Sequence, residues 1–190
     1  MWSGKDQATF LALVLMVVWA LGTTAESCSP DRINYSDFEA ASGVWYLILS
    51  RESDERYRVS GLDLNAYRYG GKLLVDVSRI FLKRTTRGCE KFTTRCEVSG
   101  NTCVDTTGYH QVVKYYIVAL DANYLVVHRT LQGNPYTLDI YSRTGVGRRL
   151  KHLPQYIRDA IEMTCGKDIA TIDSFWPGKY SPGDFISNCF

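Results

Sequence analysis

The chain has 190 residues, with 22 basic and 20 acidic side chains and a formal net charge of +2. So small a net charge provides no single-sign field to attract nucleic acid or an anionic membrane, and short basic runs such as Lys83-Arg84 are interpreted as solvated surface. The length is that of one domain with a sizeable hydrophobic core.

The N-terminus carries the pattern of a secretory signal peptide. Lys5 precedes an uncharged, largely apolar stretch, and the small residues Thr23 and Ala25 precede an expected cleavage site. We therefore expect residues 1–25 to be removed, residues 26–190 to form a single domain without a membrane span, and the protein to be secreted and extracellular. An uncut signal anchor is the alternative, because the uncharged run approaches the roughly 18 residues that span a bilayer.

Six cysteines follow this segment, and an even number behind a signal peptide predicts three disulfides formed in an oxidising compartment. They are Cys28, Cys89, Cys96, Cys103, Cys165 and Cys189. No CxxC spacing occurs among them, so no metal site is expected. Asn34-Tyr35-Ser36 fits the acceptor pattern for N-glycosylation, which makes Asn34 a predicted glycosylation site.

Between Gly43 and Arg143 the sequence predicts an all-β region of eight strands. Segments rich in Val, Ile, Leu, Tyr, Phe and Thr alternate with turns that contain glycine or asparagine. The expected strands run from about 43 to 52, 57 to 69, 72 to 85, 89 to 98, 102 to 106, 109 to 120, 124 to 131 and 136 to 143. Gly70-Gly71 predicts a tight hairpin between the second and third strands.

The connections between these strands are too short for parallel crossovers, so neighbouring strands are expected to be antiparallel and in chain order. Eight such strands can close into a barrel, which removes exposed edges and encloses room for about one small ligand. An open sandwich is the structural alternative.

After the strands the hydrophobic period changes from two to 3.6, which predicts one amphipathic helix. Its apolar face consists of Leu153, Ile157, Ala160, Ile161 and Thr164. Pro154 suits its first turn and Gly166 its C-terminal cap. We expect this helix to pack against the barrel wall. The extended piece from Ile169 to Phe175 is expected to pair with a barrel strand or lie alongside it.

From the first strand to the segment after the helix, the sequence resembles the lipocalin family. The family's Gly-x-Trp motif opens the first strand, its second motif is the turn between the sixth and seventh strands, and its third is an arginine ending the eighth. The second motif is partial, since its threonine and first tyrosine are missing. The matching positions are Gly43, Trp45, Asp121, Tyr124 and Arg143.

The resemblance implies an eight-stranded up-and-down antiparallel barrel with one C-terminal helix. It implies that Trp45 plugs a closed end and that Arg143 lays its guanidinium over the indole. It also implies a C-terminal tail tied back to the barrel, with Cys89 as the candidate partner of Cys189. Two cysteine positions common in invertebrate lipocalins, in the second and seventh strands, are not matched, so no subfamily is assigned.

The remaining disulfides are predicted from a hairpin around Ser99-Gly100, which would bring Cys96 and Cys103 nearly opposite each other, within the roughly 4.4 to 6.8 Å between Cα atoms that a bridge requires. Cys28 is then left for Cys165. A rearranged set, Cys28 with Cys103 and Cys96 with Cys165, stays open.

The resemblance implies the binding of a small hydrophobic or amphipathic ligand inside the barrel, by a carrier or scavenger. The chain's 13 tyrosines suit an amphipathic pocket, and strand alternation selects one face each of the sixth, seventh and eighth strands as the lining. The candidate ligand-binding residues are Tyr109, Val113, Tyr115, Ile117, Tyr124, Val126, His128 and Leu138. Asp63, Asp76 and Asp139 are acidic candidates for binding an amine, and each is assigned to the outer face.

Catalytic patterns are missing from the sequence, which has no nucleophile elbow, phosphate loop or HExxH. We therefore expect neither an enzyme nor a cofactor. Haem binding through an inward-pointing His128 is one alternative. The other is a protein-binding lipocalin that inhibits a host or receptor protein through its loops or tail, such as a salivary lipocalin of a blood-feeding arthropod.

Overall fold

The computed structural model describes residues 28–29, 32–33, 37–50, 59–82, 89–105, 112–131, 134–144, 153–166 and 176–177. The elements in this part of the chain are β1 (Gly43–Ser50), β2 (Val59–Tyr69), β3 (Lys72–Leu82), β4 (Cys89–Ser99), β5 (Thr102–Asp105), β6 (Val113–Leu120), β7 (Tyr124–Leu131), β8 (Asn134–Ser142), α2 (Gln155–Cys165) and β9 (Trp176–Pro177). The expected signal peptide, Asn34 and the extended piece from Ile169 to Phe175 lie outside the described residues.

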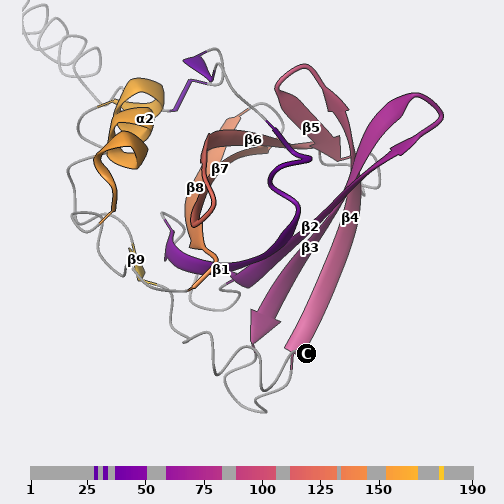
Figure 1. The fold of residues 1–190 in the computed structure, drawn as a ribbon, viewed down its shortest axis with the longest axis horizontal. Coiled ribbons are helices and arrows are strands. Elements are labelled where there is room, and N and C mark those ends of the chain that lie inside the picture. The colour runs from indigo at the N-terminus through magenta and orange to yellow at the C-terminus, as the bar shows by residue number, and fades with distance from the viewer. Residues whose placement is uncertain are drawn as a thin grey trace, which may run out of the picture.

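Strands β1 to β8 form a closed antiparallel meander (Figure 1). Each strand pairs with its neighbours in chain order, and β1 closes the sheet because it pairs with both β2 and β8. The up-and-down barrel is therefore confirmed, and the open sandwich is excluded. The two-residue strand β9 adds a short antiparallel pairing to the end of β1.

Local chemistry at the turns agrees with the hairpin predictions. Gly70 and Gly71 join β2 to β3 with φ values of 59° and 79°, a backbone conformation that two-residue hairpins need and that glycine adopts at little cost. The start of β8 differs from the prediction, because the strand begins at Asn134 rather than at residue 136. Its register against β7 shifts between Arg129 and Thr130, beside Pro135, which has no amide hydrogen to donate to the ladder.

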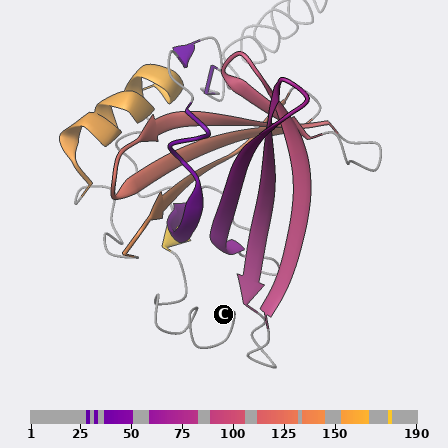
Figure 2. The same cartoon turned by 45° about the vertical axis from the view of Figure 1, so that its right-hand side comes forward.

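The strand registers define two different ends of the barrel. The start of β1, the turns β2–β3, β4–β5 and β6–β7, and the end of β8 lie together at what we call the closed end. The other ends of these strands form the open end, whose connections fall outside the described residues. Figure 2 shows β2, β3 and β4 running side by side along one wall of the barrel.

Apolar side chains gather in two clusters on opposite faces of the sheet. The interior cluster lies on the inner face of the barrel and consists of Phe38, Ala41, Trp45, Leu47, Leu62, Leu64, Val75, Val77, Cys96, Cys103, Tyr115, Ile117, Leu125, Val127 and Tyr141. The outer cluster joins the outside of the barrel to α2 and consists of Cys28, Ile33, Ile48, Leu49, Tyr116, Val118, Ala119, Val126, Leu138, Ile140, Leu153, Ile157, Ile161 and Cys165.

Helix α2 lies outside the barrel beside β6, β7 and β8 (Figure 1). Its buried side is the one predicted from the 3.6-residue period, with Ile157 and Ile161 fully buried. Gly166 ends the helix at φ 86°, and its amide donates to the Glu162 carbonyl at 2.8 Å. Pro154 occupies the cap position immediately before the first turn.

Two of the predicted disulfides are confirmed. Cys96 and Cys103 are bridged across the β4–β5 hairpin with Cα atoms 5.3 Å apart, and Cys28 is bridged to Cys165 at the end of α2. The rearranged pairing is therefore excluded. Cys89 is also disulfide-bonded, and its predicted partner Cys189 lies outside the described residues.

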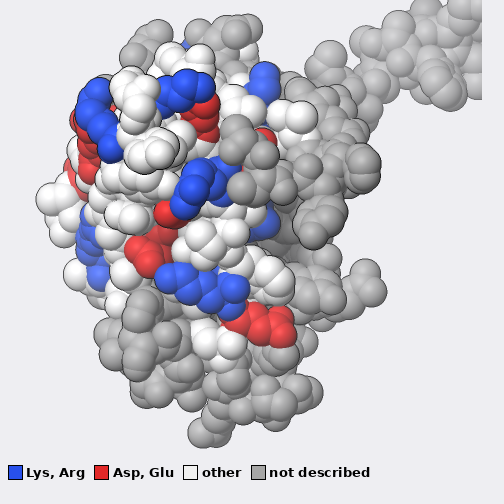
Figure 3. Space-filling model, turned by 90° about the vertical axis from the view of Figure 1, so that its right-hand side faces the viewer, with Lys and Arg blue, Asp and Glu red and all other residues white. Residues whose placement is uncertain are grey.

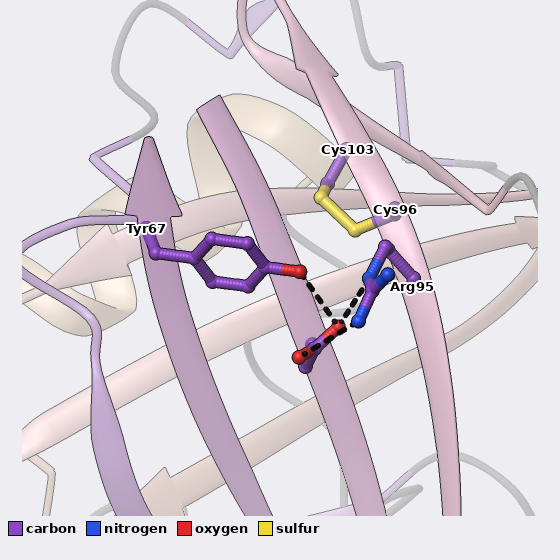
Figure 4. Close-up of a disulfide and its surroundings, with 5 residues drawn as sticks. Tyr67, Arg95, Cys96 and Cys103 are labelled. Atoms are coloured by element: carbon purple, nitrogen blue, oxygen red, sulfur yellow. Dashed lines mark hydrogen bonds and ion pairs between the residues drawn. A yellow bond between two sulfur atoms is a disulfide. The ribbon is translucent and has the colours of Figure 1, made fainter. Parts of the chain in front are cut away.

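Charged side chains of both signs alternate over the outer face of β2, β3 and β4 (Figure 3). Ion pairs join Lys91 to Asp63 at 3.2 Å and Arg95 to Asp76 at 2.8 Å. The hydroxyl of Tyr67 also donates to Asp76 on this face, while the Cys96–Cys103 bridge lies on the other side of β4 (Figure 4). Among the described residues, no helix is both long and apolar enough to cross a membrane.

Candidate functional site: the barrel interior

The closed end is sealed by Trp45, which is fully buried. The Arg143 guanidinium carbon lies 3.6 Å from the centroid of the indole, as the family resemblance implied. The same guanidinium donates hydrogen bonds to the carbonyls of Val44 at 2.8 Å and Ser42 at 2.7 Å. The indole Nε1 donates to the Ala41 carbonyl at 2.7 Å, so each polar group around the plug has a partner.

Asp121 organises the β6–β7 turn at the same end. Its carboxylate accepts hydrogen bonds from the amides of Asn123 and Tyr124, at 2.7 and 2.6 Å, and from the Tyr156 hydroxyl of α2. Partial burial opposes ionisation, but these three hydrogen bonds prevail and lower the pKa of Asp121 below its ordinary value. The Asn123 carbonyl in turn accepts the Arg143 amide, which links this turn to the end of β8.

Strand β6 places its predicted lining residues inside the barrel. Tyr115 and Ile117 belong to the interior cluster, and the half-buried Val113 packs against it. Tyr109 lies outside the described residues. Ligand binding by these side chains stays a prediction, but their direction is the one that strand alternation selected.

The prediction of which face of β7 and β8 points into the barrel is wrong. Val126 and Leu138 belong to the outer cluster beneath α2, and Tyr124 packs against that cluster. His128 points the same way, with its ring centroid 5.9 Å from that of Tyr116. Because α2 covers the outside of these strands, their outer face is apolar, while their inner face also carries the polar side chains of Arg129 and Asp139. Side-chain polarity therefore could not identify the inner face.

His128 therefore does not point into the interior, as the haem alternative required. It is only 1% exposed, and its Nδ1 has no hydrogen-bond partner. Burial lowers the pKa of His128 to about 4, so the imidazole is neutral at physiological pH. The described residues contain no group of three or more His, Cys, Asp or Glu side chains that could hold a metal ion.

The interior changes from apolar to polar along the barrel axis. On β1, β3, β4, β7 and β8 the inward residues near the closed end are apolar, and the next inward residues toward the open end are polar. Beyond these polar residues, β3 and β4 carry the inward aromatic side chains of Phe81 and Phe92. In that direction the inward positions are Trp45, Leu47 and Ser50 on β1; Val75, Val77 and Arg79 on β3; Cys96 and Thr94 on β4; Leu125, Val127 and Arg129 on β7; and Tyr141, Asp139 and Thr137 on β8. We call the apolar part the floor and the polar part the polar layer.

A buried ion pair stands at the centre of the polar layer. Arg129 donates to the Oδ2 of Asp139 through Nε at 3.1 Å and through a terminal nitrogen at 2.8 Å, and both side chains are almost fully buried. Ser50, Thr137 and Tyr141 also donate to this carboxylate, at 2.6, 3.3 and 3.4 Å. Five hydrogen bonds therefore compensate the desolvation of Asp139.

Two corrections follow from this network. Asp139 was assigned to the outer face and instead points inward, whereas Asp63 and Asp76 do lie on the outer face in surface ion pairs. Sequence reasoning also missed Arg129, although a signal was present. Arg129 lies two positions from Val127, which faces Asp139 across the hairpin, so both charges share one face.

The closed eight-stranded meander, the tryptophan plug beneath an arginine and the helix on the outer wall define a lipocalin fold. The structure of insecticyanin from the tobacco hornworm Manduca sexta is similar, with a TM-score of 0.50 and 15% identity over 85% of this chain and 87% of that chain. Apocrustacyanin C2 also has a TM-score of 0.50, with 14% identity over 84% and 93% of the two chains. No protein-family model and no curated protein sequence matches the chain.

Proposed function

We propose that the protein binds a small hydrophobic or amphipathic molecule inside its barrel and acts as an extracellular carrier or scavenger. The observation that carries the proposal is the division of the interior into an apolar floor and a polar layer, which suits a ligand with one apolar and one polar end. Three disulfide-bonded pairs were expected from the cysteine count, and the two bridges described support an oxidising, extracellular compartment. Nothing among the described residues favours the inhibitor alternative.

The lining residues proposed on β6 are Val113, Tyr115 and Ile117, which face inward on a strand that also borders the β5 wall. On β7 and β8 the inward residues replace the earlier candidates, so Val127 and Tyr141 are proposed in place of Val126 and Leu138.

Binding of N-phenyl-1-naphthylamine, an uncharged fluorescent probe, tests the proposal. The wild-type protein is expected to bind it saturably, at about one molecule per chain, and to show quenching of its tyrosine and tryptophan emission. Val113→Trp, which fills the interior near the open end, should weaken binding about tenfold or more. Lys114→Trp places the same side chain on the outer face and is the matched control. Absence of saturable binding, or equal effects of the two variants, would contradict an interior site.

A further inference from the structure

Three buried polar atoms on the interior face have no hydrogen-bond partner. They are the Nε of Arg79, the Oγ1 of Thr94 and the hydroxyl of Tyr115. Tyr115 is 3% exposed, so its hydroxyl does not reach bulk water. Since a buried polar group without a hydrogen-bond partner destabilises the fold, three on one surface point to a molecule that supplies the missing partners.

The registers bring these atoms to one region of the polar layer. Arg79 on β3 lies opposite Phe92, and Thr94 is the next inward residue of β4, so the two side chains are diagonal neighbours on the interior face. Tyr115 pairs directly with Arg129 across β6 and β7. The charges of Arg79 and Arg129 and the hydroxyl of Tyr115 all act on the Tyr141 hydroxyl, so all three groups lie in the part of the interior around Tyr141.

The charge of Arg79 is not compensated by a carboxylate of the described residues. Asp139 accepts five hydrogen bonds, two of them from Arg129. Glu90 lies on the interior face nearer the open end and Asp105 lies opposite Cys96, and both already have interaction partners. Arg79 forms none of the ion pairs found among the described residues.

We propose that the polar layer binds the carboxylate of an amphipathic acid, with Arg79 as its charge partner and the hydroxyls of Tyr115 and Thr94 as hydrogen-bond donors. The inference rests on the proposed function and names the ligand class. A guanidinium only donates, so Arg79 selects an acceptor and disfavours an amine. A carboxylate bound here would accept a charge-assisted hydrogen bond from the buried Nε of Arg79, a half-buried residue whose Nε otherwise has no partner.

The apolar part of such a ligand has surfaces to contact on the open-end side. Phe81 and Phe92 form an edge-to-face pair with ring centroids 5.5 Å apart, and Phe92 is 52% exposed. Both rings are on the interior face, next to Arg79 and Glu90 in the β3–β4 register. A partly exposed aromatic pair beside a half-buried cation favours a molecule that carries both a hydrocarbon portion and an anion.

A carboxylic acid and its uncharged methyl ester, used as fluorescent probes, test the inference. We would compare 11-(dansylamino)undecanoic acid with its methyl ester at pH 7.4, using wild-type protein, Arg79→Met and Tyr115→Phe. Arg68→Met is the matched control, because Arg68 is an exposed arginine paired with Glu39 on the surface. The wild type should bind the acid about tenfold or more tightly than the ester. Arg79→Met should reduce this ratio to about one, Tyr115→Phe should lower it several-fold, and Arg68→Met should preserve it.

The thermal midpoint of each variant separates a binding role from a structural one. Because the Nε of Arg79 and the hydroxyl of Tyr115 have no protein partners, Arg79→Met and Tyr115→Phe should unfold at or above the wild-type midpoint. A clear fall in midpoint for Arg79→Met, or an unchanged acid-to-ester ratio, would overturn the assignment of Arg79. Equal binding of both probes by the wild type would overturn the carboxylate inference and leave the proposed function standing. If the wild type binds neither probe nor N-phenyl-1-naphthylamine, the proposed function itself fails.

Discussion

Single polar residues in this barrel have opposite consequences according to the face on which they lie. Asp139 and His128 are on adjacent strands and are both about 1% exposed. Asp139 points inward and forms an ion pair with Arg129 within a network of five hydrogen bonds. His128 points outward, on the side that α2 covers, and burial lowers its pKa so that it is neutral. The inward side chain of Asp139 is thus part of an ion pair, whereas the outward imidazole of His128 is uncharged.

His128 should make the protein less stable in mild acid. Its pKa is about 4 in the folded chain and about 6.5 when unfolded, so between these values the unfolded state binds more protons. The free energy of unfolding should therefore fall as the pH is lowered from about 6.5 to about 4, by on the order of 3 kcal/mol. Denaturant unfolding of wild type and His128→Gln at several pH values would measure this, because carboxylates contribute similarly to both proteins. The same pH dependence in the two proteins would show that His128 is not the group responsible.

At the scale of the element, the start of β1 explains why a glycine precedes the tryptophan plug. Gly43 has a φ of 109°, and a Cβ at this position would lie 2.6 Å from a terminal nitrogen of Arg143. That nitrogen donates to the Val44 carbonyl, so it cannot yield without loss of the hydrogen bond. The glycine thus serves both the backbone conformation and the close approach of the arginine over the indole.

Gly43→Ala should destabilise the fold by about 3 kcal/mol, through backbone strain and displacement of the Arg143 hydrogen bonds. Gly70→Ala is the control, since Gly70 also has a positive φ of 59° but open space around its Cα. Its cost should be only the left-handed backbone penalty of about 1 kcal/mol. Urea denaturation would compare the two variants, and equal losses would mean that the Arg143 contact is not what requires the glycine.

Helix α2 determines which side chains of three strands are buried on the outside of the barrel. Its apolar face covers the outside of β6, β7 and β8, with Ile157 and Ile161 in the same cluster as Val126 and Ile140. Every position of β7 from residue 125 to 130 is consequently buried. Because both faces of this strand are buried, neither is made polar by contact with water, and side-chain polarity does not indicate which face is inside.

At the scale of the whole molecule, two bridges constrain very different lengths of chain. Cys28–Cys165 spans 137 residues and fastens the N-terminal segment to the end of α2, while Cys96–Cys103 spans seven residues of one hairpin. Replacing both cysteines of a pair by alanine should cost about 5 kcal/mol for the long bridge and about 2.5 kcal/mol for the hairpin in the chain-entropy model. Thermal and denaturant unfolding of the two double variants would give the order. A hairpin bridge that proved as costly to remove as the long one would contradict this account.

The sequence by itself determined the parts of this protein that depend on local rules. Period-two alternation and glycine turns predicted the eight strands and their antiparallel order, and Gly70-Gly71 formed the expected hairpin. The 3.6-residue period predicted α2 and its buried face. The β4–β5 hairpin predicted the Cys96–Cys103 bridge, because residues so close in the chain can meet in only a few ways.

Only the tertiary structure decided which face of β7 and β8 is inside the barrel. Alternation divides a strand into two faces, but the identity of the inner one depends on what covers the outer wall, and α2 is contributed by a later part of the chain. The ion pair of Arg129 with Asp139 and the unpartnered Arg79 depend on register and closure in the same way. Their burial is a property of the closed barrel, because each strand places them there only after β1 has paired with both β2 and β8.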